Sequence, residues 1–213
     1  MDRGFYYIPY KSRRNSYIKH KEVLRLLSEY SYDDAMQFLE QTTKKVNLEI
    51  GFGSGEFILT KAIENPNDIY LGCEVYNPGI VNLVKNLKKN NINNVFIYKG
   101  DARELLINTV DLSFSNVYIL FPDPWPKNKH HKRRLINQSF LSFIRKKFRS
   151  SLCIATDHSG YAQSILHDAL QCGGYIVEMS KIKKEKCFYT KFEDKAISKS
   201  SCIFHLVLSH KQS

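Results

Sequence analysis

Apolar and polar residues alternate over residues 46–50, which predicts a β-strand ending at Gly51. Three glycines follow at alternate positions, Gly51, Gly53 and Gly55. Glycine permits positive φ angles and lets a ligand approach the bare backbone. A helical period then begins, and its predicted buried face consists of Phe57, Ile58, Ala62 and Ile63. This order is typical of the first βα unit of a nucleotide-binding fold, and a plain strand-to-helix turn is the alternative.

Strand-like and helix-like segments continue to alternate along the rest of the chain. Further strands are predicted at residues 69–75, 95–98, 117–121, 152–156, 175–179 and 202–208. Helices are predicted at residues 32–41, after an Asn77 N-cap and Pro78, over a face of Leu135, Phe140, Ile144 and Phe148, and at residues 159–171. This order predicts an α/β fold with a mostly parallel seven-stranded sheet, helices on both faces and an antiparallel last strand.

The length of 213 residues suits one domain with short additions. We expect residues 41–213 to form that domain and residues 1–40 to form a basic, aromatic-rich arm with a leading helix. The arm combines Arg3, Lys11, Arg13, Arg14, Lys19, Lys21 and Arg25 with Phe5, Tyr6, Tyr7, Tyr10 and Tyr17. Cations interleaved with rings suit nucleic acid, and a solvated tail is the alternative.

Composition limits the kinds of binding partner and the cellular compartment that we expect for this protein. A formal charge of +11 favours a polyanionic partner or a soluble basic surface, and charge alone does not distinguish them. The five cysteines are odd in number and form no C-x-x-C pair, which predicts buried reduced thiols rather than disulfides or a metal site. The sequence holds no run of 18 apolar residues and no signal-like N-terminus, so we expect a cytoplasmic protein without membrane association.

Three acidic residues, Glu49, Glu74 and Asp101, each lie at the carboxyl end of a predicted strand. Those ends form the ligand crevice of an open α/β sheet, so we expect the three carboxylates to converge there. Glu74 lies where ribose hydroxyls are held in such folds, and residues 100–102 lie where a side chain could contact adenine. Glu56 replaces the third glycine of a dinucleotide fingerprint and would repel a pyrophosphate. The pocket therefore favours a positively charged ligand without phosphate.

The predicted fourth strand runs into the sequence Pro-Asp-Pro-Trp-Pro at residues 122–126. Alternate prolines are expected to hold the intervening residues extended, which would display Asp123 and Trp125 at the edge of the crevice. A structural proline-rich turn is the alternative. Five cations follow within eight residues, namely Lys127, Lys129, Lys132, Arg133 and Arg134. This cluster indicates contacts to an RNA backbone, and a solvated charged face is the alternative.

Seven short motifs stand out along the chain, at residues 48–55, 72–75, 101–102, 121–127, 131–134, 155–157 and 190–193. Together and in this order they resemble one family, the bacterial tRNA (guanine-N7)-methyltransferases of the TrmB type. The glycine motif is common to many methyltransferases. The combination of P-D-P-W, K-R-R and T-K-F-E is far more selective, and the resemblance covers roughly residues 46–210.

The resemblance implies a Rossmann-like class I methyltransferase that transfers the methyl group of S-adenosylmethionine to N7 of guanine 46 in the tRNA variable loop. It implies cofactor contacts at Glu49, Gly51, Gly53, Gly55, Glu74, Asp101, Ala102 and Asp123. It implies substrate contacts at Lys127, Asp157, Thr190, Lys191, Phe192 and Glu193, and a catalytic role for Asp123. We expect tRNA as the partner, no metal, and a monomer or homodimer without an obligate protein partner.

The chemistry of guanine N7 limits what the enzyme must supply. N7 carries an in-plane lone pair and needs no general base, so alignment with the methyl group is the main requirement. We hypothesise that Asp123 accepts hydrogen bonds from the guanine edge and stabilises the ring as it becomes cationic, with Asp157 and Glu193 as further acceptors. The base is expected to flip out and stack on Trp125, Phe192 or Tyr189, although a core role for Trp125 is equally open.

Three other functions remain to be weighed. A methyltransferase acting on an exocyclic amine of DNA or RNA would share the cofactor fold, but its usual signature has two prolines before the aromatic residue. Here Asp123 and Pro124 are followed directly by Trp125. A nucleotide-dependent oxidoreductase is disfavoured by Glu56. A non-catalytic RNA-binding module would not need three acids around a glycine crevice.

Overall fold

A computed structural model of the chain describes residues 20–109, 112–183, 186–199 and 201–211. Residues 1–19, about half of the predicted arm, lie outside these ranges, and so does the predicted contact of their cations and rings with nucleic acid. The described part begins with helices α1 (His20–Leu27) and α2 (Tyr32–Gln41), and α2 has the predicted bounds. Leu27 and Leu39 from these helices are buried in the cores. The predicted boundary between arm and domain at residue 40 stays a prediction.

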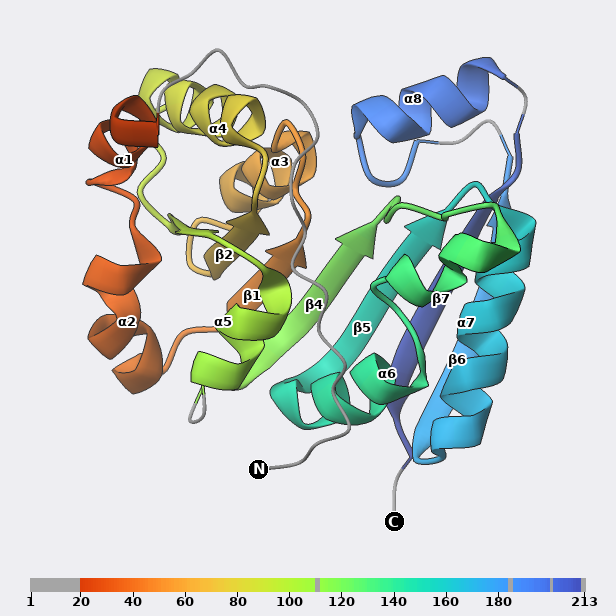
Figure 1. Cartoon of the computed structure of the whole chain (residues 1–213). Helices are drawn as coiled ribbons and strands as arrows, with labels where there is room; N and C mark the ends of the chain where they lie inside the picture. Colours follow the sequence, from red (N-terminus) through yellow and green to blue (C-terminus); the bar gives the residue numbers. More distant parts are fainter. Residues whose placement is uncertain (1–19, 110–111, 184–185, 200, 212–213) are drawn as a thin grey trace.

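Seven strands form one mixed sheet in the order β3-β2-β1-β4-β5-β7-β6 (Figure 1). The strands are β1 (Val46–Ile50), β2 (Ile69–Glu74), β3 (Val95–Lys99), β4 (Phe114–Leu120), β5 (Phe148–Thr156), β6 (Tyr175–Ile182) and β7 (Ile203–His210). β1 pairs in parallel with β2 and with β4, whereas β7 is antiparallel to both β5 and β6. The predicted mixed sheet with an antiparallel last strand is confirmed.

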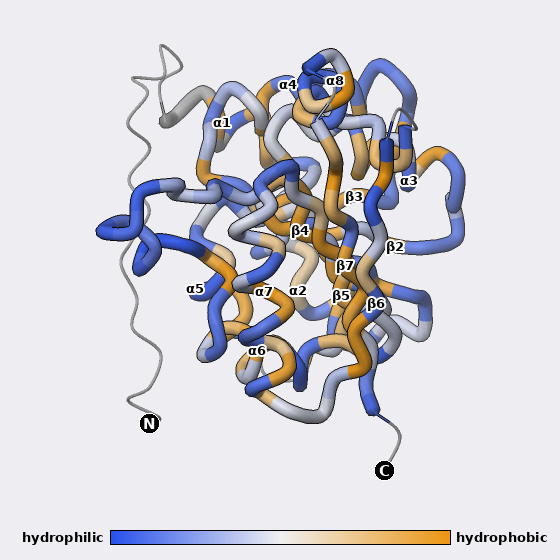
Figure 2. The backbone as a smooth tube through the Cα atoms, turned by 90° about the vertical axis from the view of Figure 1, so that its right-hand side faces the viewer, coloured by the Kyte–Doolittle hydropathy of each residue, from blue (hydrophilic) through white to orange (hydrophobic). Residues whose placement is uncertain are grey.

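Helices cover both faces of this sheet. One face is packed by α2 together with α5 (Ala102–Asn108), α6 (Gln138–Ile144) and α7 (Ser159–Cys172). The other is packed by α1, α3 (Glu56–Glu64) and α4 (Asn77–Lys89). Every residue of β1 and β2 is buried, as expected for parallel strands covered on two sides. Figure 2 shows hydrophobic segments along strands β4, β5 and β7 in the interior of the molecule.

A further helix, α8 (Lys191–Ser198), lies beyond the arrowheads of β4 and β5 in Figure 1. A third, smaller core joins it to the ends of these strands, since Ala196 packs in one cluster with Leu120 and Ala155. Two short 3₁₀ helices, η1 (Asn128–Arg133) and η2 (Arg145–Lys147), complete the described elements. No helix within the described ranges is both long and apolar enough to cross a lipid bilayer.

Several local predictions need correction. Ile63 is 49% exposed, because it is rotated by about 140° from Ile58 around α3 and so leaves the buried face. Asn77 is the first residue of α4 rather than its N-cap, which is Tyr76. Leu135 and Phe148 fall outside α6, which spans only residues 138–144. Leu135 precedes the helix, and Phe148 is the first residue of β5. All five cysteines are free, but only Cys73 among them is fully buried.

Candidate active site

The glycine turn between β1 and α3 adopts the backbone conformation that its sequence predicts. Gly51, Gly53 and Gly55 have φ angles of 74°, 57° and 82°. A Cβ atom at Gly51 would meet nothing within 4 Å, and one at Gly53 would meet only Phe192, at 3.9 Å. A Cβ atom at Gly55 would lie 2.8 Å from Leu83 of α4. The first two glycines therefore present bare backbone to open space, and the third allows a helix to pack closely.

Two residues of α4 support this turn and were not singled out in the sequence. A Cβ atom at Gly79 would lie 1.9 Å from the carbonyl oxygen of Gly53, so only glycine fits at that contact. Asn82 Nδ2 donates a hydrogen bond to the carbonyl oxygen of Ser54 at 2.8 Å. The sequence did offer a signal for Gly79, because a glycine in the first turn of a predicted helix indicates a close approach of another backbone.

The Glu49 carboxyl group is buried at the end of β1 beside the turn. Its Oε2 atom has no hydrogen-bond partner among the residues that the structure describes. Burial, and after it the charges of Glu74 and Glu56, raise the pKa of this carboxyl to about 8, against a smaller opposing effect of a backbone hydrogen bond from Ile58. An unpaired buried carboxyl is unfavourable, and a positively charged group would satisfy it and lower its pKa. The arrangement is suited to a cationic ligand.

Glu74, at the end of β2, connects the glycine turn to the next strand. Its Oε2 atom accepts a hydrogen bond from the Gly53 backbone N–H at 2.8 Å. Its Oε1 atom accepts from the backbone N–H groups of Val75 and Tyr76 at 2.6 and 2.9 Å. Burial raises the pKa of Glu74, and these three backbone donors oppose that shift. The carboxylate therefore braces the turn in addition to lining the crevice.

Asp101 lies at the end of β3, where its position along the chain predicts it. The carboxylate caps α5 by accepting from the Arg103 backbone N–H at 2.9 Å, and it pairs with Arg103 Nε at 3.0 Å. Ala102 beside it is buried. The charge of Glu74 raises the pKa of Glu49, and the charge of Asp123 raises that of Glu74. The acids converge on one edge of the sheet, as predicted, although Asp101 already has a cationic partner.

A cavity of about 160 Å³ lies beyond the ends of β4 and β5. Its lining brings together Asp123, Asp157 and Phe192, which the sequence places far apart. Both aspartates are exposed, and Phe192 is 57% exposed while its ring stacks on Phe121 with centroids 6.4 Å apart. The remaining lining residues are Phe121, Pro122, Pro124, Lys195 and Lys199. The two lysines were missed because the sequence predicted no helix at α8.

The first turn of α8 joins this cavity to the glycine turn. Lys191 Nζ lies 3.1 Å from Ser54 Oγ and 3.1 Å from Glu56 Oε1. The next residue, Phe192, faces both Gly53 and the cavity. The cation of Lys191 thus partly offsets the acids of the crevice, and residues 190–193 close one side of it.

Thr190 and Glu193 both make hydrogen bonds within the protein, and the predicted contact of Thr190 with substrate stays a prediction. Thr190 Oγ1 accepts from the Glu193 backbone N–H at 3.0 Å and caps α8. Glu193 is 0% exposed, and its carboxylate accepts from the backbone N–H groups of Cys187 and Phe188 at 2.7 and 3.0 Å. An enclosed carboxylate that already holds two donors does not face the cavity. The expectation that Glu193 accepts from guanine gives way to a role in shaping the turn before α8.

The proline-rich loop is more tightly bent than predicted. Phe121 and Trp125, which each precede a proline, have φ angles of 52° and 44°. Trp125 is therefore not extended, although a residue before proline favours extended backbone. A non-glycine residue keeps the left-handed conformation only where the surrounding structure holds it. The Trp125 side chain is partly exposed and packs edge-on against His130 at 5.8 Å.

The basic cluster divides into exposed and buried members. Lys127, Lys129, Lys132 and Arg133 are exposed, and the Arg133 guanidinium lies 4.9 Å from the centre of the Trp125 ring. Arg134 is only 6% exposed, and its Nε donates to the carbonyl oxygen of Pro124 at 2.9 Å. Its predicted contact with the RNA backbone is therefore replaced by a contact within the protein.

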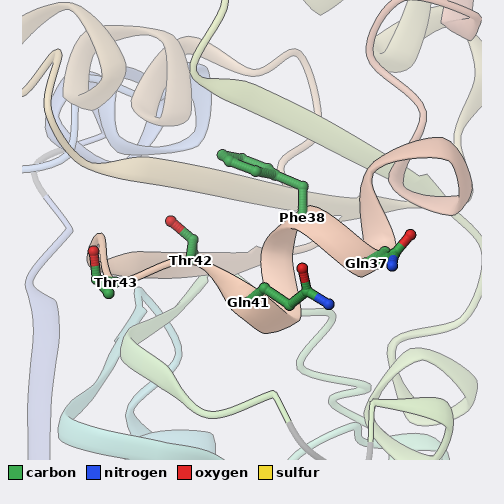
Figure 3. Close-up of a pocket in the computed structure, with 5 residues that line it drawn as sticks. All are labelled: Gln37, Phe38, Gln41, Thr42 and Thr43. Carbon is green, nitrogen blue, oxygen red and sulfur yellow. The ribbon is translucent and has the colours of Figure 1, made fainter.

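A larger, shallow hollow of about 620 Å³ lies at the opposite edge of the sheet. Figure 3 shows the five side chains around it, from α2 and the segment leading into β1: Gln37, Phe38, Gln41, Thr42 and Thr43. It carries no ionisable group, and it lies at the amino end of β1, away from the acids. In the described part of the chain, no group of three His, Cys, Asp or Glu side chains is placed to hold a metal ion.

The fold and the acid-lined glycine turn define a Rossmann-like methyltransferase. An antibiotic-related methyltransferase has a similar structure, with a TM-score of 0.62 and 17% identity over 96% of this chain and 100% of that chain. TrmK of M. capricolum, solved with S-adenosyl-homocysteine, has a TM-score of 0.51 and 11% identity over 92% of this chain and 70% of that chain. At these identities the likeness shows the fold alone.

The sequence comparisons define the family. The profile of a family described as "Putative methyltransferase" matches residues 43–206. A tRNA (guanine-N(7)-)-methyltransferase of Wolbachia pipientis wMel is 40% identical over 160 residues, covering 73% of this chain and 72% of that protein. The protein of that name from Neorickettsia sennetsu is 42% identical over 135 residues, covering 62% of each. The chain belongs to the tRNA (guanine-N7)-methyltransferase family.

The buried Glu49 carboxyl predicts a specific pH dependence of stability. Its pKa is about 8 in the folded protein against 4.5 for the free side chain, so the folded state binds the proton more tightly. The contribution of this group to the free energy of unfolding is then fully present below pH 4.5. It is lost as the pH rises through 8, by up to about 1.4 kcal/mol per pH unit. Urea unfolding of the ligand-free protein across this window should show the decline, and Glu49→Gln should flatten it. Equal slopes in both proteins would contradict the assignment.

The buried Glu193 carboxylate predicts a stability effect rather than a binding effect. Glu193→Gln replaces one acceptor oxygen by an amide that cannot accept, so we expect the free energy of unfolding to fall by about 1–3 kcal/mol. Asp157→Asn, at an exposed carboxylate, should change it by less than about 0.5 kcal/mol. Denaturant unfolding measures both. An unchanged free energy of unfolding for Glu193→Gln would contradict the structural role.

Proposed function

We propose that this protein transfers a methyl group from S-adenosylmethionine to N7 of guanine 46 in the variable loop of tRNA. The observation that carries the proposal is that α8 contacts two neighbouring parts of one site. One half is the acid-lined glycine turn, and the other is the cavity with Asp123 and Asp157. The names of the curated relatives support the choice of tRNA guanine and of N7.

The first half-site fits the proposed cofactor. The open backbone at Gly51 and Gly53 leaves room for a ligand, and the unpaired Glu49 oxygen calls for a positively charged donor. Glu74 and Asp101 lie where ribose and adenine would be held, with Ala102 beside them. When bound, S-adenosylmethionine supplies a methyl group on a positively charged sulfonium. The fold neighbour TrmK, solved with the product form of this cofactor, supports the same class of ligand.

The second half-site fits a purine that becomes positively charged. Asp123 is exposed in the cavity, so its carboxylate can accept hydrogen bonds from the guanine edge and stabilise the ring as positive charge develops. Asp157 offers a second acceptor, and the exposed ring of Phe192 offers a surface on which the base can stack. Neither aspartate needs to remove a proton, because N7 reacts through its lone pair.

The exposed cations of η1 and of Lys127, its N-cap residue, fit the phosphate backbone of the substrate. Lys127, Lys129, Lys132 and Arg133 carry four positive charges beside the cavity. Binding through such charges weakens steeply with salt because counterions are released from the nucleic acid. Lys195 and Lys199 extend the same charge to the cavity wall. The proposal includes a cytoplasmic location, and a monomer or homodimer that needs no other protein.

Methylation of an unmodified tRNA transcript tests the proposal. The protein is incubated with tRNA and S-adenosylmethionine that carries a labelled methyl group, and the alkali-labile site is then mapped. We expect one labelled guanine, at position 46, because N7 methylation makes that site labile. Label in an alkali-stable exocyclic amine would overturn the assignment of N7. An RNA that binds without gaining label would overturn the enzymatic function.

The role of Asp123 predicts an effect on turnover rather than on cofactor binding. Asp123→Asn keeps the shape of the side chain but removes the charge that stabilises the cationic ring. We expect kcat to fall by about 10²–10³-fold, the usual effect of losing one preorganised electrostatic contact. Calorimetry should show nearly unchanged affinity for S-adenosylhomocysteine. Equal losses of turnover and affinity would refute the catalytic role.

A further inference from the structure

We propose that Arg134 is a positioning residue that holds the loops of Asp123 and Asp157 in a single arrangement. The inference rests on the proposed function and assigns to Arg134 a task different from that of its exposed neighbours. One buried guanidinium contacts both segments that carry the exposed aspartates of the cavity.

The first contact is with the loop of Asp123. Arg134 Nε donates to the carbonyl oxygen of Pro124 at 2.9 Å, and Pro124 directly follows Asp123. Prolines lack an N–H group, so this stretch can be held through its carbonyl oxygens but not through donors of the prolines. Arg134 Nη2 also lies 3.0 Å from His131 Nε2, which must be the acceptor because arginine only donates.

The second contact is with the segment after Asp157. The Arg134 guanidinium carbon lies 4.7 Å from the centre of the Tyr161 ring. Tyr161 is fully buried in the first turn of α7, four residues after Asp157, and its hydroxyl accepts from the Ile136 backbone N–H at 3.0 Å. The guanidinium therefore lies between a rigid aromatic ring and the proline-rich loop.

The loop needs such a support because its backbone is strained. Phe121 and Trp125, on either side of Asp123, both have positive φ angles. Non-glycine residues keep this conformation only where the surrounding structure holds them in it. The Phe121 backbone N–H donates to the carbonyl oxygen of Ala155 at 2.8 Å and anchors the near end. The bond from Arg134 to Pro124 anchors the far end, so Asp123 lies between two anchors.

Kinetics separate this role from a contact with RNA. Arg134→Lys keeps the charge but loses the planar fork that reaches Pro124, His131 and Tyr161 together. We expect kcat to fall about 100-fold, the effect of a small misplacement of a catalytic group, with unchanged KM for tRNA and unchanged salt dependence of binding. Lys132→Met, at an exposed cation of the same cluster, should instead raise KM and reduce the salt slope by about one, with kcat retained.

Fluorescence of Trp125 provides a readout that does not depend on the reaction. It is the only tryptophan of the chain and it lies in the loop itself. Arg134→Lys should increase quenching of its emission by acrylamide in the absence of tRNA, whereas Lys132→Met should not. If the wild-type protein fails to methylate tRNA, the proposed function fails, and the quenching comparison still tests the support of the loop.

A pair of variants at His131 covers the case in which Arg134→Lys does not fold. His131→Gln keeps an acceptor for Arg134 Nη2, and His131→Leu removes it. We expect increased Trp125 quenching and reduced kcat for His131→Leu, and values near wild type for His131→Gln. The inference is overturned if the two behave alike, or if a folded Arg134→Lys raises only KM while quenching stays at the wild-type value.

Discussion

The candidate site is determined by the like charges that converge at the carboxyl edge of the sheet. Glu49, Glu56 and Glu74 lie close enough that the charges of the other two raise the pKa of Glu49. Backbone N–H groups satisfy Glu74, and Lys191 pairs with Glu56, but one oxygen of Glu49 keeps no partner among the described residues. Such a site is costly until a positive group enters it. The same charges make it unfavourable for a pyrophosphate.

The elements around this edge are arranged so that α8 links two chemically different half-sites. Lys191 contacts the glycine turn, whereas the neighbouring Phe192 lines the cavity that holds Asp123 and Asp157. Glu193 and Thr190 contribute by holding the backbone that presents these two side chains. Arg134 acts similarly on the loop of Asp123, through the carbonyl oxygen of Pro124. The cavity therefore depends on buried polar residues that do not themselves face it.

The sequence predicted the sheet, its antiparallel last strand and the convergence of the acids, because strand periodicity and the topology of α/β sheets determine where strand ends meet. It could not separate Arg134 from Arg133 or Glu193 from Asp157. The two members of each pair carry the same charge, and their exposure depends on packing between segments far apart in the chain. The bend at Trp125 was likewise hidden, since proline favours extended backbone in the preceding residue and the left-handed conformation is held by contacts from elsewhere in the fold.

The central claim is that the glycine turn accepts a positively charged ligand without phosphate. Calorimetric titration of the protein with S-adenosylhomocysteine, and separately with NAD, tests it most directly. The first ligand retains an ammonium group and lacks phosphate, whereas the second carries a pyrophosphate. We expect saturable binding of S-adenosylhomocysteine and none of NAD at the same concentrations. Binding of NAD, or no binding of S-adenosylhomocysteine, would contradict the account.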